Sequence, residues 1–488
     1  MPFLSTKLPQ KMENSKLILV MRNFSPKQLQ NFSDFVASPY FNKKNELVVF
    51  YTYLLQQSPN FSGDSMQRQK VYANVYGKDE AYNEKQLGYL MSDLFALMEQ
   101  FLVVEKNNKE NMPYYLHLLD FYLEKNLEKP FHHILRTAQK YQENTPFRDF
   151  MHYYNQFQLY SREYMFFDYQ RKHLFDENLQ KALDNLDYYY LALKLRYSCE
   201  ITNVQKMLTS QYDLKLFNEI WSYIQMYPQN DVPIVAIYTR IFYCMTDGDN
   251  EMHFEELKQL LKDNIQLFPI EEARSMYIYA INYCIGKVNA GSSRYLGEML
   301  QLYQILLDKR IIFDNQNNIS PWTYINLVTI GVRNQDYEWT HNFINEYQKF
   351  LAPQFRQNAY SYNLAYLYFH QKYYDKTLSL LNEVIFDDVI YSIDSKLLLL
   401  RTYYELGEDS AFESLCISFS TYLKRNKLIT NDKKNRYIQF IRFISQIHRQ
   451  NPNKPLADIE KEIQQTKGLV NKAWLLEKIA QLKTKKRR

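Results

Sequence analysis

Apolar residues recur every three or four positions along almost the whole chain, a period that favours packed helices over strands. The clearest stretch runs from Asn83 to Leu102. Its apolar positions are Leu87, Leu90, Met91, Leu94, Met98 and Phe101. Asn83 and Gln86 are spaced as a capping box, which predicts that a helix begins there. The periodicity therefore predicts an all-α protein.

Glycine is scarce, with 10 glycines in 488 residues. Glycine supplies the positive φ angles of tight hairpin turns and the close backbone approach of phosphate-binding loops. Beyond Asn83, no Asn-Gly or Asp-Gly pair lies between alternating apolar residues, because Asp247-Gly248 separates two helical patterns. Sheet-rich folds and dinucleotide-binding folds are therefore disfavoured.

Three Ser-Pro or Thr-Pro pairs precede helical patterns, at Ser25-Pro26, Thr145-Pro146 and Ser320-Pro321. A hydroxyl residue followed by proline is typical of an N-cap and the first helical position. Each pair predicts the start of a helix.

The chain divides into four expected segments. They are a loose N-terminal tail (1–22), an N-terminal helical domain (23–106), an array of helical hairpins (113–450), and C-terminal capping helices with a basic tail (451–488). Met12 and Met21 are alternative starts within the tail. A polar break at 107–113 separates the second and third segments, and apolar positions at 455–482 predict the helix pair that covers the open end of an array.

The segment Tyr362–Tyr368, with Leu364-Ala365 at its centre, has the pattern of a first repeat helix, and Tyr373-Tyr374 marks the following turn. Similar patterns occur around Leu327 and around Leu399, so the period is about 35 residues. Residues 322–425 therefore resemble tetratricopeptide-type (TPR) helical hairpins. Weaker hairpins at 234–266 and 272–308 extend the resemblance.

The resemblance implies an α-solenoid, a stack of hairpins whose concave face binds a protein or peptide. Val328 and Leu400 depart from the family by replacing a small residue of the first helix. At the small position of the second helix stand Thr340, Thr377 and Phe412. These departures put the usual superhelical pitch in doubt, and a bundle of antiparallel helices without regular stacking is the alternative.

The charge of the chain is concentrated at its C-terminus. The formal net charge is +5, and five of the last six residues are basic, so the other residues sum to zero. A nucleic-acid-binding body is expected to carry a basic excess of its own, because phosphate contacts dominate such affinity. A nucleic-acid partner is therefore less favoured than a protein or peptide partner.

Cysteine usage and the N-terminus predict a cytoplasmic protein without a membrane partner. The four cysteines include no Cys-x-x-Cys motif, which fits a reducing compartment. The apolar run Leu17–Met21 is too short for a signal core or a membrane span.

The sequence contains no P-loop, no G-x-S-x-G elbow and no H-E-x-x-H motif. Adjacent His132 and His133 point about 100° apart on a helix and are expected at the surface, unable to share a metal easily. The segment 247–251 resembles the start of a calcium loop, but Met252 replaces its required glycine and Lys258 its required glutamate, so an interhelix turn is the better interpretation. We expect no cofactor, no metal and no enzymatic activity.

Two features are candidates for peptide binding. Tyrosine and phenylalanine are abundant, as in Tyr153–Phe167 and Tyr188–Tyr190, and either fill helix–helix seams or line a groove. In the resembled family, asparagines on the concave helices hold the backbone of a bound peptide. Asn282, Asn326 and Asn363, with Tyr362, are the matching candidates here. This asparagine ladder predicts that Asn326→Ala with Asn363→Ala abolishes partner capture at a nearly unchanged melting temperature.

The alternative function is a regulator that contacts DNA or RNA. Its contacts would come from the basic tail, Lys485, Lys486, Arg487 and Arg488, or from helices at 65–76 and 83–102 with Arg68 and Lys70 on phosphates. The turn between those helices is longer than in a helix-turn-helix motif, and the second helix is acidic. The expectation is therefore a non-enzymatic scaffold or adaptor.

Overall fold

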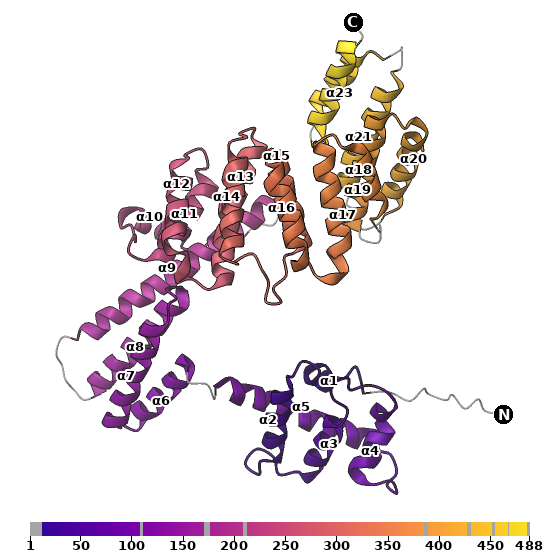
Figure 1. The fold of residues 1–488 in the computed structure, drawn as a ribbon. Coiled ribbons are helices and arrows are strands. Elements are labelled where there is room, and N and C mark those ends of the chain that lie inside the picture. The colour runs from indigo at the N-terminus through magenta and orange to yellow at the C-terminus, as the bar shows by residue number, and fades with distance from the viewer. Residues whose placement is uncertain are drawn as a thin grey trace. The chain divides into compact units, whose positions relative to one another are not determined.

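A computed structural model of the chain describes residues 12–107, 111–169, 176–207, 212–384, 389–426, 431–450, 454–466 and 468–485. Within these ranges the chain is 78% helical and has no strand, which confirms the predicted all-α class. The chain divides into two compact units, Met1–Tyr190 (unit 1) and Leu191–Arg488 (unit 2) (Figure 1).

Unit 1 begins with a hydrophobic core built by five helices. These are α1 (Lys16–Met21), α2 (Pro26–Ala37), α3 (Asn45–Leu55), α4 (Arg68–Tyr76) and α5 (Glu84–Asn107), with the short 3-10 helix η1 (Asp64–Met66). The predicted apolar face of α5 is confirmed, since Leu87, Leu94 and Phe101 are buried. Asn83 Oδ1 accepts the N–H groups of Lys85 and Gln86, which confirms its role as the N-cap.

The expected loose tail is wrong for residues 12–22. Leu17, Ile18 and Met21 on α1 are buried in the same core as α2–α5, and Met12 is fully buried there too. The periodicity of the sequence did not predict α1 because this helix has only six residues, too few to show a repeating apolar pattern. So short a helix is stabilised by tertiary packing rather than by helix propensity. Residues 1–11 lie outside the described residues.

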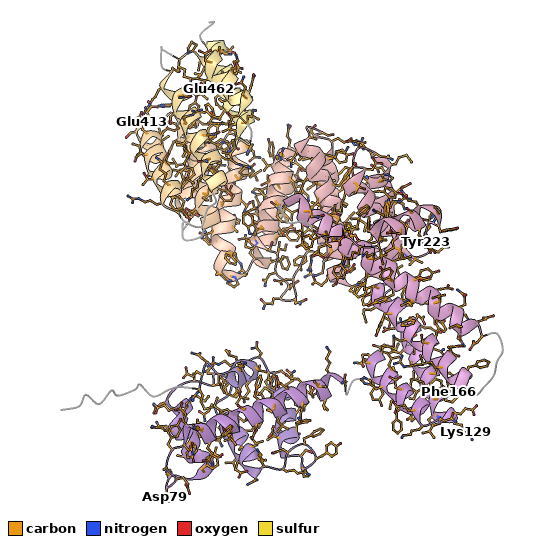
Figure 2. The ribbon with its side chains drawn as sticks, turned by 180° about the vertical axis from the view of Figure 1, so that it is seen from behind. Asp79, Lys129, Phe166, Tyr223, Glu413 and Glu462 are labelled. Atoms are coloured by element: carbon orange, nitrogen blue, oxygen red, sulfur yellow. The ribbon has the colours of Figure 1, made fainter. Side chains whose placement is uncertain are left out.

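Unit 1 contains a second core beyond residue 111. It is built by α6 (Met112–Glu124), α7 (Glu128–Asn144) and α8 (Phe150–Tyr169), and the long α9 (Glu177–Met207) follows. Phe166 on α8 is labelled in Figure 2. Its ring stacks on that of Phe131 on α7, with 4.3 Å between the ring centres. The Tyr153–Tyr188 and Tyr154–Tyr189 ring pairs join α8 to α9, so the seam interpretation holds for these tyrosines.

One predicted helix start is wrong and two are confirmed. Ser25 and Ser320 cap α2 and α15 (Pro321–Arg333), each with proline in the first turn. Thr145 instead ends α7, and α8 begins at Phe150. Asp149 Oδ1 accepts the His152 N–H at 3.0 Å, so a stronger capping residue four positions later sets the start of α8.

Unit 2 continues from residue 191 of α9 with α10 (Phe217–Met226) and two helical hairpins. The first hairpin pairs α11 (Pro233–Thr246) with α12 (Met252–Asn264), and the second pairs α13 (Ile270–Asn289) with α14 (Tyr295–Asp308). The 3-10 helix η2 (Ile265–Leu267) joins the two hairpins. These are the weaker hairpins expected at 234–266 and 272–308, and the segment 247–251 forms the interhelix turn.

Three further hairpins occupy the region that resembles TPR repeats. They pair α15 with α16 (Tyr337–Tyr347), α17 (Pro353–His370) with α18 (Tyr374–Asn382), and α19 (Val389–Leu406) with α20 (Asp409–Arg425), with η3 (Gln348–Phe350) after α16. The first helices pack in order, α15 on α17 and α17 on α19. Within the first hairpin the two helices approach closely, because any Cβ at Gly331 would clash with Thr340 Oγ1.

The C-terminal region contains α21 (Asn431–Arg449), α22 (Leu456–Gln465) and α23 (Lys472–Lys485). The predicted helix pair at 455–482 is thus present. Trp474 Nε1 on α23 donates to Glu405 Oε1 on α19 at 2.9 Å, which ties the pair to the preceding hairpin.

Residues 113–190 of the expected array belong to unit 1, so the array at 113–450 is divided between the units. The polar break at 107–113 falls between the two cores of unit 1. The unit to which a helix belongs depends on the helices it packs against. The sequence does not reveal this, because the helical periodicity is similar on both sides of residue 190.

Candidate functional site

Unit 2 contains a groove of about 370 Å³ between α9, α11 and α13, which we call the α9–α13 groove. Its main lining residues are Asn203 of α9, Cys244 and Met245 of α11, and Tyr279, Asn282 and Gly286 of α13. The volume is within the range of ligand pockets. The groove therefore has room for a few side chains of a bound peptide.

A buried carboxylate fixes the three helices that form the groove. Glu272 on α13 is 6% exposed and accepts a hydrogen bond of 2.5 Å from the Tyr238 hydroxyl on α11. Its other oxygen lies 3.4 Å from an Arg196 guanidinium nitrogen on α9. Burial, together with the Glu272 charge, raises the pKa of Tyr238 far above its ordinary value, so this tyrosine remains a hydrogen-bond donor.

Polar side chains give the groove its recognition chemistry. Asn282 is exposed and Asn203 is half-buried, and each amide can both donate and accept hydrogen bonds. Lys287 Nζ lies 5.6 Å from the centre of the Tyr283 ring and 4.0 Å from Asp249 Oδ1. The Tyr283 hydroxyl donates to the Gly248 carbonyl at 2.9 Å, which fixes the turn at one end of the groove.

Gly286 leaves the groove open at a helical position. An added Cβ there would meet no atom within 4 Å, although glycine inside a helix costs about 1 kcal/mol relative to alanine. Packing therefore does not require a glycine at position 286. Because glycine has no side chain, the groove stays open at this point of α13.

The cysteines beside the groove are not activated nucleophiles. Burial raises the pKa of the Cys244 thiol to about 12 and that of the Cys284 thiol to about 12. Both are therefore neutral at pH 7, whereas thiol chemistry requires the thiolate. Among the described residues, no cluster of three or more His, Cys, Asp or Glu side chains is arranged to hold a metal ion. His132 and His133 are both exposed, as expected.

The three asparagines expected in a ladder have different environments. Asn282 lines the α9–α13 groove, but Asn326 and Asn363 do not. Asn326 is exposed on α15. Asn363 is 1% exposed, and its Nδ2 donates to the Ala359 carbonyl one turn earlier at 2.8 Å. The ladder is therefore wrong at Asn363, whose amide is satisfied within its own helix.

Tyr362 is also buried, at 7% exposure. Burial raises its pKa well above the ordinary value, so its ring belongs to the core between α17 and its neighbours. The expected peptide-binding role of Tyr362 is therefore not supported, because the resemblance that suggested it does not show which face of the helix is covered by its neighbours.

The residues expected to contact nucleic acid are partly paired with carboxylates. Arg68 lies 3.2 Å from Glu84, and Lys70 is paired with Asp64. The backbone of Lys485 ends α23, while the Lys485 side chain and Lys486, Arg487 and Arg488 lie outside the described residues. At the predicted phosphate contacts of the N-terminal helices, the charges of Arg68 and Lys70 are therefore partly neutralised by neighbouring carboxylates.

Among the described residues, only α5 is long and apolar enough to cross a membrane by length and composition. Its buried residues, including Leu94 and Met98, form one side of the N-terminal core. A core helix has the same composition, so this finding is weak support for a membrane span.

Asn203 is the groove residue that sequence reasoning missed. It lies outside the region with repeat periodicity, and only the packing of α9 on the first hairpins brings it beside Asn282. No residue spacing in the sequence indicates this pairing. Comparisons of the chain with protein-family models, with curated proteins and with solved structures found no match.

Proposed function

We propose that this chain is a non-enzymatic cytoplasmic scaffold or adaptor that binds an extended peptide segment of a protein partner in the α9–α13 groove. The observation that carries the proposal is that two amide side chains, Asn203 and Asn282, line the same open groove. An extended peptide exposes N–H and C=O groups that have no partner within the peptide, and amides satisfy both kinds.

Apolar side chains flank the amide on α13. Ile278 and Ile285 are 46% and 40% exposed, and they stand four residues before and three residues after Asn282. This spacing places all three residues on one face of the helix. A peptide bound by Asn282 would therefore bury these isoleucines, which supplies the apolar contact that polar groups alone do not.

The order of the hairpins supports the proposal that unit 2 is a TPR-like repeat array. Each first helix of the region 321–425 contacts the first helix of the next hairpin, and α16 and α18 each contact the following first helix. In such an array the first helices share one face, which we propose is the concave binding face.

The chemistry along the groove suits binding better than catalysis. Its described lining residues offer amides, the Lys287 ammonium, the Asp249 carboxylate and the neutral Cys244 thiol, and none of them is a nucleophile hydrogen-bonded to a general base. The partner is therefore proposed to be recognised and released unchanged.

Filling the groove tests the proposal. Gly286→Leu places a side chain in open space within the groove, and Gly297→Leu on α14 is the matched control, because its Cβ also meets no atom within 4 Å. The wild-type chain and both variants are used to capture partners from a lysate of the source organism after nuclease treatment. We expect specific proteins with the wild type and with Gly297→Leu, and their loss with Gly286→Leu.

Two results would contradict the proposal. The first is that nuclease treatment removes all captured proteins, which would favour the nucleic-acid alternative. The second is that Gly286→Leu, with an unchanged melting temperature, captures the same proteins as the wild type. Direct titration of each captured protein with the purified variants separates groove binding from indirect association.

A further inference from the structure

Unit 1 contains a second groove, of about 520 Å³, between α8 and the first turns of α9. We call it the α8–α9 groove. Its apolar wall consists of Phe157 and Tyr164 from α8 and of Leu179, Leu183 and Leu186 from α9. All of these residues belong to unit 1.

The leucines on α9 are unusually exposed for a helix face with this spacing. Leu179 and Leu183 are each 51% exposed and Leu186 is 37% exposed. Their spacing of four and then three residues forms one apolar stripe about 10 Å long. A stripe of this kind normally packs against another helix, as in helix-in-groove recognition.

Acidic residues lie at the start of α9 and next to its exposed leucines in the sequence. Asp176 lines the groove at the start of α9, and Asp184 and Asp187 follow on the same helix. Lys181 does not offset them, because its ammonium pairs with Glu177 at 3.2 Å. Arg162 on α8 is similarly paired with Asp120 at 2.7 Å.

Asp176 at the start of α9 has one oxygen that caps the helix and one that does not. Asp176 Oδ1 accepts the Asn178 N–H at 2.8 Å, whereas Asp176 Oδ2 is buried and accepts no hydrogen bond from any residue that the structure describes. Glu163 on α8 is close enough for the Asp176 charge to add to burial in raising the pKa of Glu163. An uncompensated carboxylate beside an apolar groove is stabilised by a cation from an occupant.

We propose that the α8–α9 groove binds an amphipathic helix of a partner protein, with leucine-type residues on one face and lysine or arginine residues beside them. The apolar face would cover Leu179, Leu183 and Leu186, and a basic residue would reach Asp176 Oδ2. A second copy of this chain fits less well, because its own α9 carries the acidic residues Asp184 and Asp187 next to its leucines in the sequence.

The test uses a defined probe and the full chain. The probe is a fluorescent 18-residue helical peptide with leucines at positions i, i+3, i+4 and i+7 and lysines elsewhere. The same leucine pattern with glutamates and a scrambled Leu/Lys peptide of equal composition are the peptide controls. Fluorescence anisotropy should show saturable binding of the patterned Leu/Lys peptide and weaker binding of both controls.

Leu183→Arg tests the location of the site, and Leu19→Arg on α1 is its matched control, because both leucines are 51% exposed on helices. Leu183→Arg should weaken binding of the Leu/Lys peptide by at least about tenfold. Leu19→Arg should leave it unchanged. Asp176→Asn keeps the helix cap, since asparagine caps equally well, and should reduce the salt dependence of binding.

Three outcomes would overturn the proposal. One is equal weakening by Leu183→Arg and Leu19→Arg. Another is equal affinity for the Leu/Lys and Leu/Glu peptides. The third is a dimer of the wild-type chain in analytical ultracentrifugation that Leu183→Arg dissociates, because a second copy would then be the occupant.

Discussion

The helix α9 contributes to two grooves of different chemistry, one in each unit. Its first turns supply leucines and Asp176 to the α8–α9 groove, whereas Asn203 near its end supplies an amide to the α9–α13 groove. The α8–α9 groove is apolar, with Asp176 at one end. The α9–α13 groove has two amide side chains and is left open by Gly286. Hydrophobic spacing and charge suit a helix, while amide groups suit an extended strand.

The two grooves also differ in how their carboxylates are satisfied. Glu272 below the α9–α13 groove is buried and contacts both Tyr238 and Arg196. Asp176 in the α8–α9 groove has one buried oxygen that accepts no hydrogen bond within the described part of the chain. A satisfied buried carboxylate stabilises the fold around it, whereas an unsatisfied one is available to a ligand at a cost in stability.

The largest expected effect comes from removing these carboxylates. Glu272→Ala removes the acceptor of the buried Tyr238 hydroxyl and a carboxylate that faces Arg196, and should destabilise unit 2 by about 3 kcal/mol. Asp176→Asn should leave the stability of unit 1 unchanged or slightly higher, because the helix cap survives and a charge is removed. Urea unfolding followed by circular dichroism measures both, and tryptophan fluorescence isolates unit 2, because all four tryptophans lie beyond residue 190. Equal destabilisation by the two variants would contradict the idea that Glu272 stabilises the fold whereas Asp176 is available to a ligand.

Acid pH provides a smaller effect, with one histidine in each unit. Burial, and then the nearby Arg148, lowers the pKa of His152 to about 4, while burial, and then Arg401, lowers that of His370 to about 4. A histidine with a lowered folded-state pKa stabilises the fold above pH 6.5, and this stability is lost as the pH falls from 6.5 towards 4. The loss should be about 1–2 kcal/mol for each histidine, given partial screening by solvent.

Hydrogen exchange assigns this acid effect to each unit. Peptides from α8 should lose protection between pH 6.5 and pH 4 in the wild type and keep more of it in His152→Gln. Peptides from α17 should respond in the same way to His370→Gln only. An α8 response to His370→Gln would mean that the two histidines do not act on separate units.

The smallest effect separates the two asparagines expected to act alike. Asn363→Ala should cost about 1 kcal/mol, because a buried side-chain hydrogen bond to the Ala359 carbonyl is lost, and should not change partner capture. Asn282→Ala should leave the melting temperature unchanged and weaken capture by the α9–α13 groove. The reverse pattern would restore Asn363 as a binding residue and refute the proposed groove.

The sequence alone was sufficient for the all-α class and for most of the helices, although it missed α1 and misplaced the start of α8. The apolar period predicted α5 and its buried face, and the Ser-Pro pairs predicted the starts of α2 and α15. The repeat pattern located the hairpins between residues 321 and 425. These features depend on contacts between residues a few positions apart, so local spacing determines them.

The candidate sites depended on contacts that local spacing does not encode. Asn282 was predicted, but Asn203 was not, because the two amides come together only through packing of α9 against α11 and α13. Asn363 has the same helical context as Asn282, yet the neighbouring hairpins bury it.

The sequence by itself therefore determined that this protein is helical and where most hairpins lie. Only the tertiary structure decided that α1 belongs to the N-terminal core, that the chain divides at residue 190, and which asparagines face solvent. The physical reason is that helix formation follows from the period of apolar residues within one segment. Burial of a given side chain instead depends on which distant segment covers it.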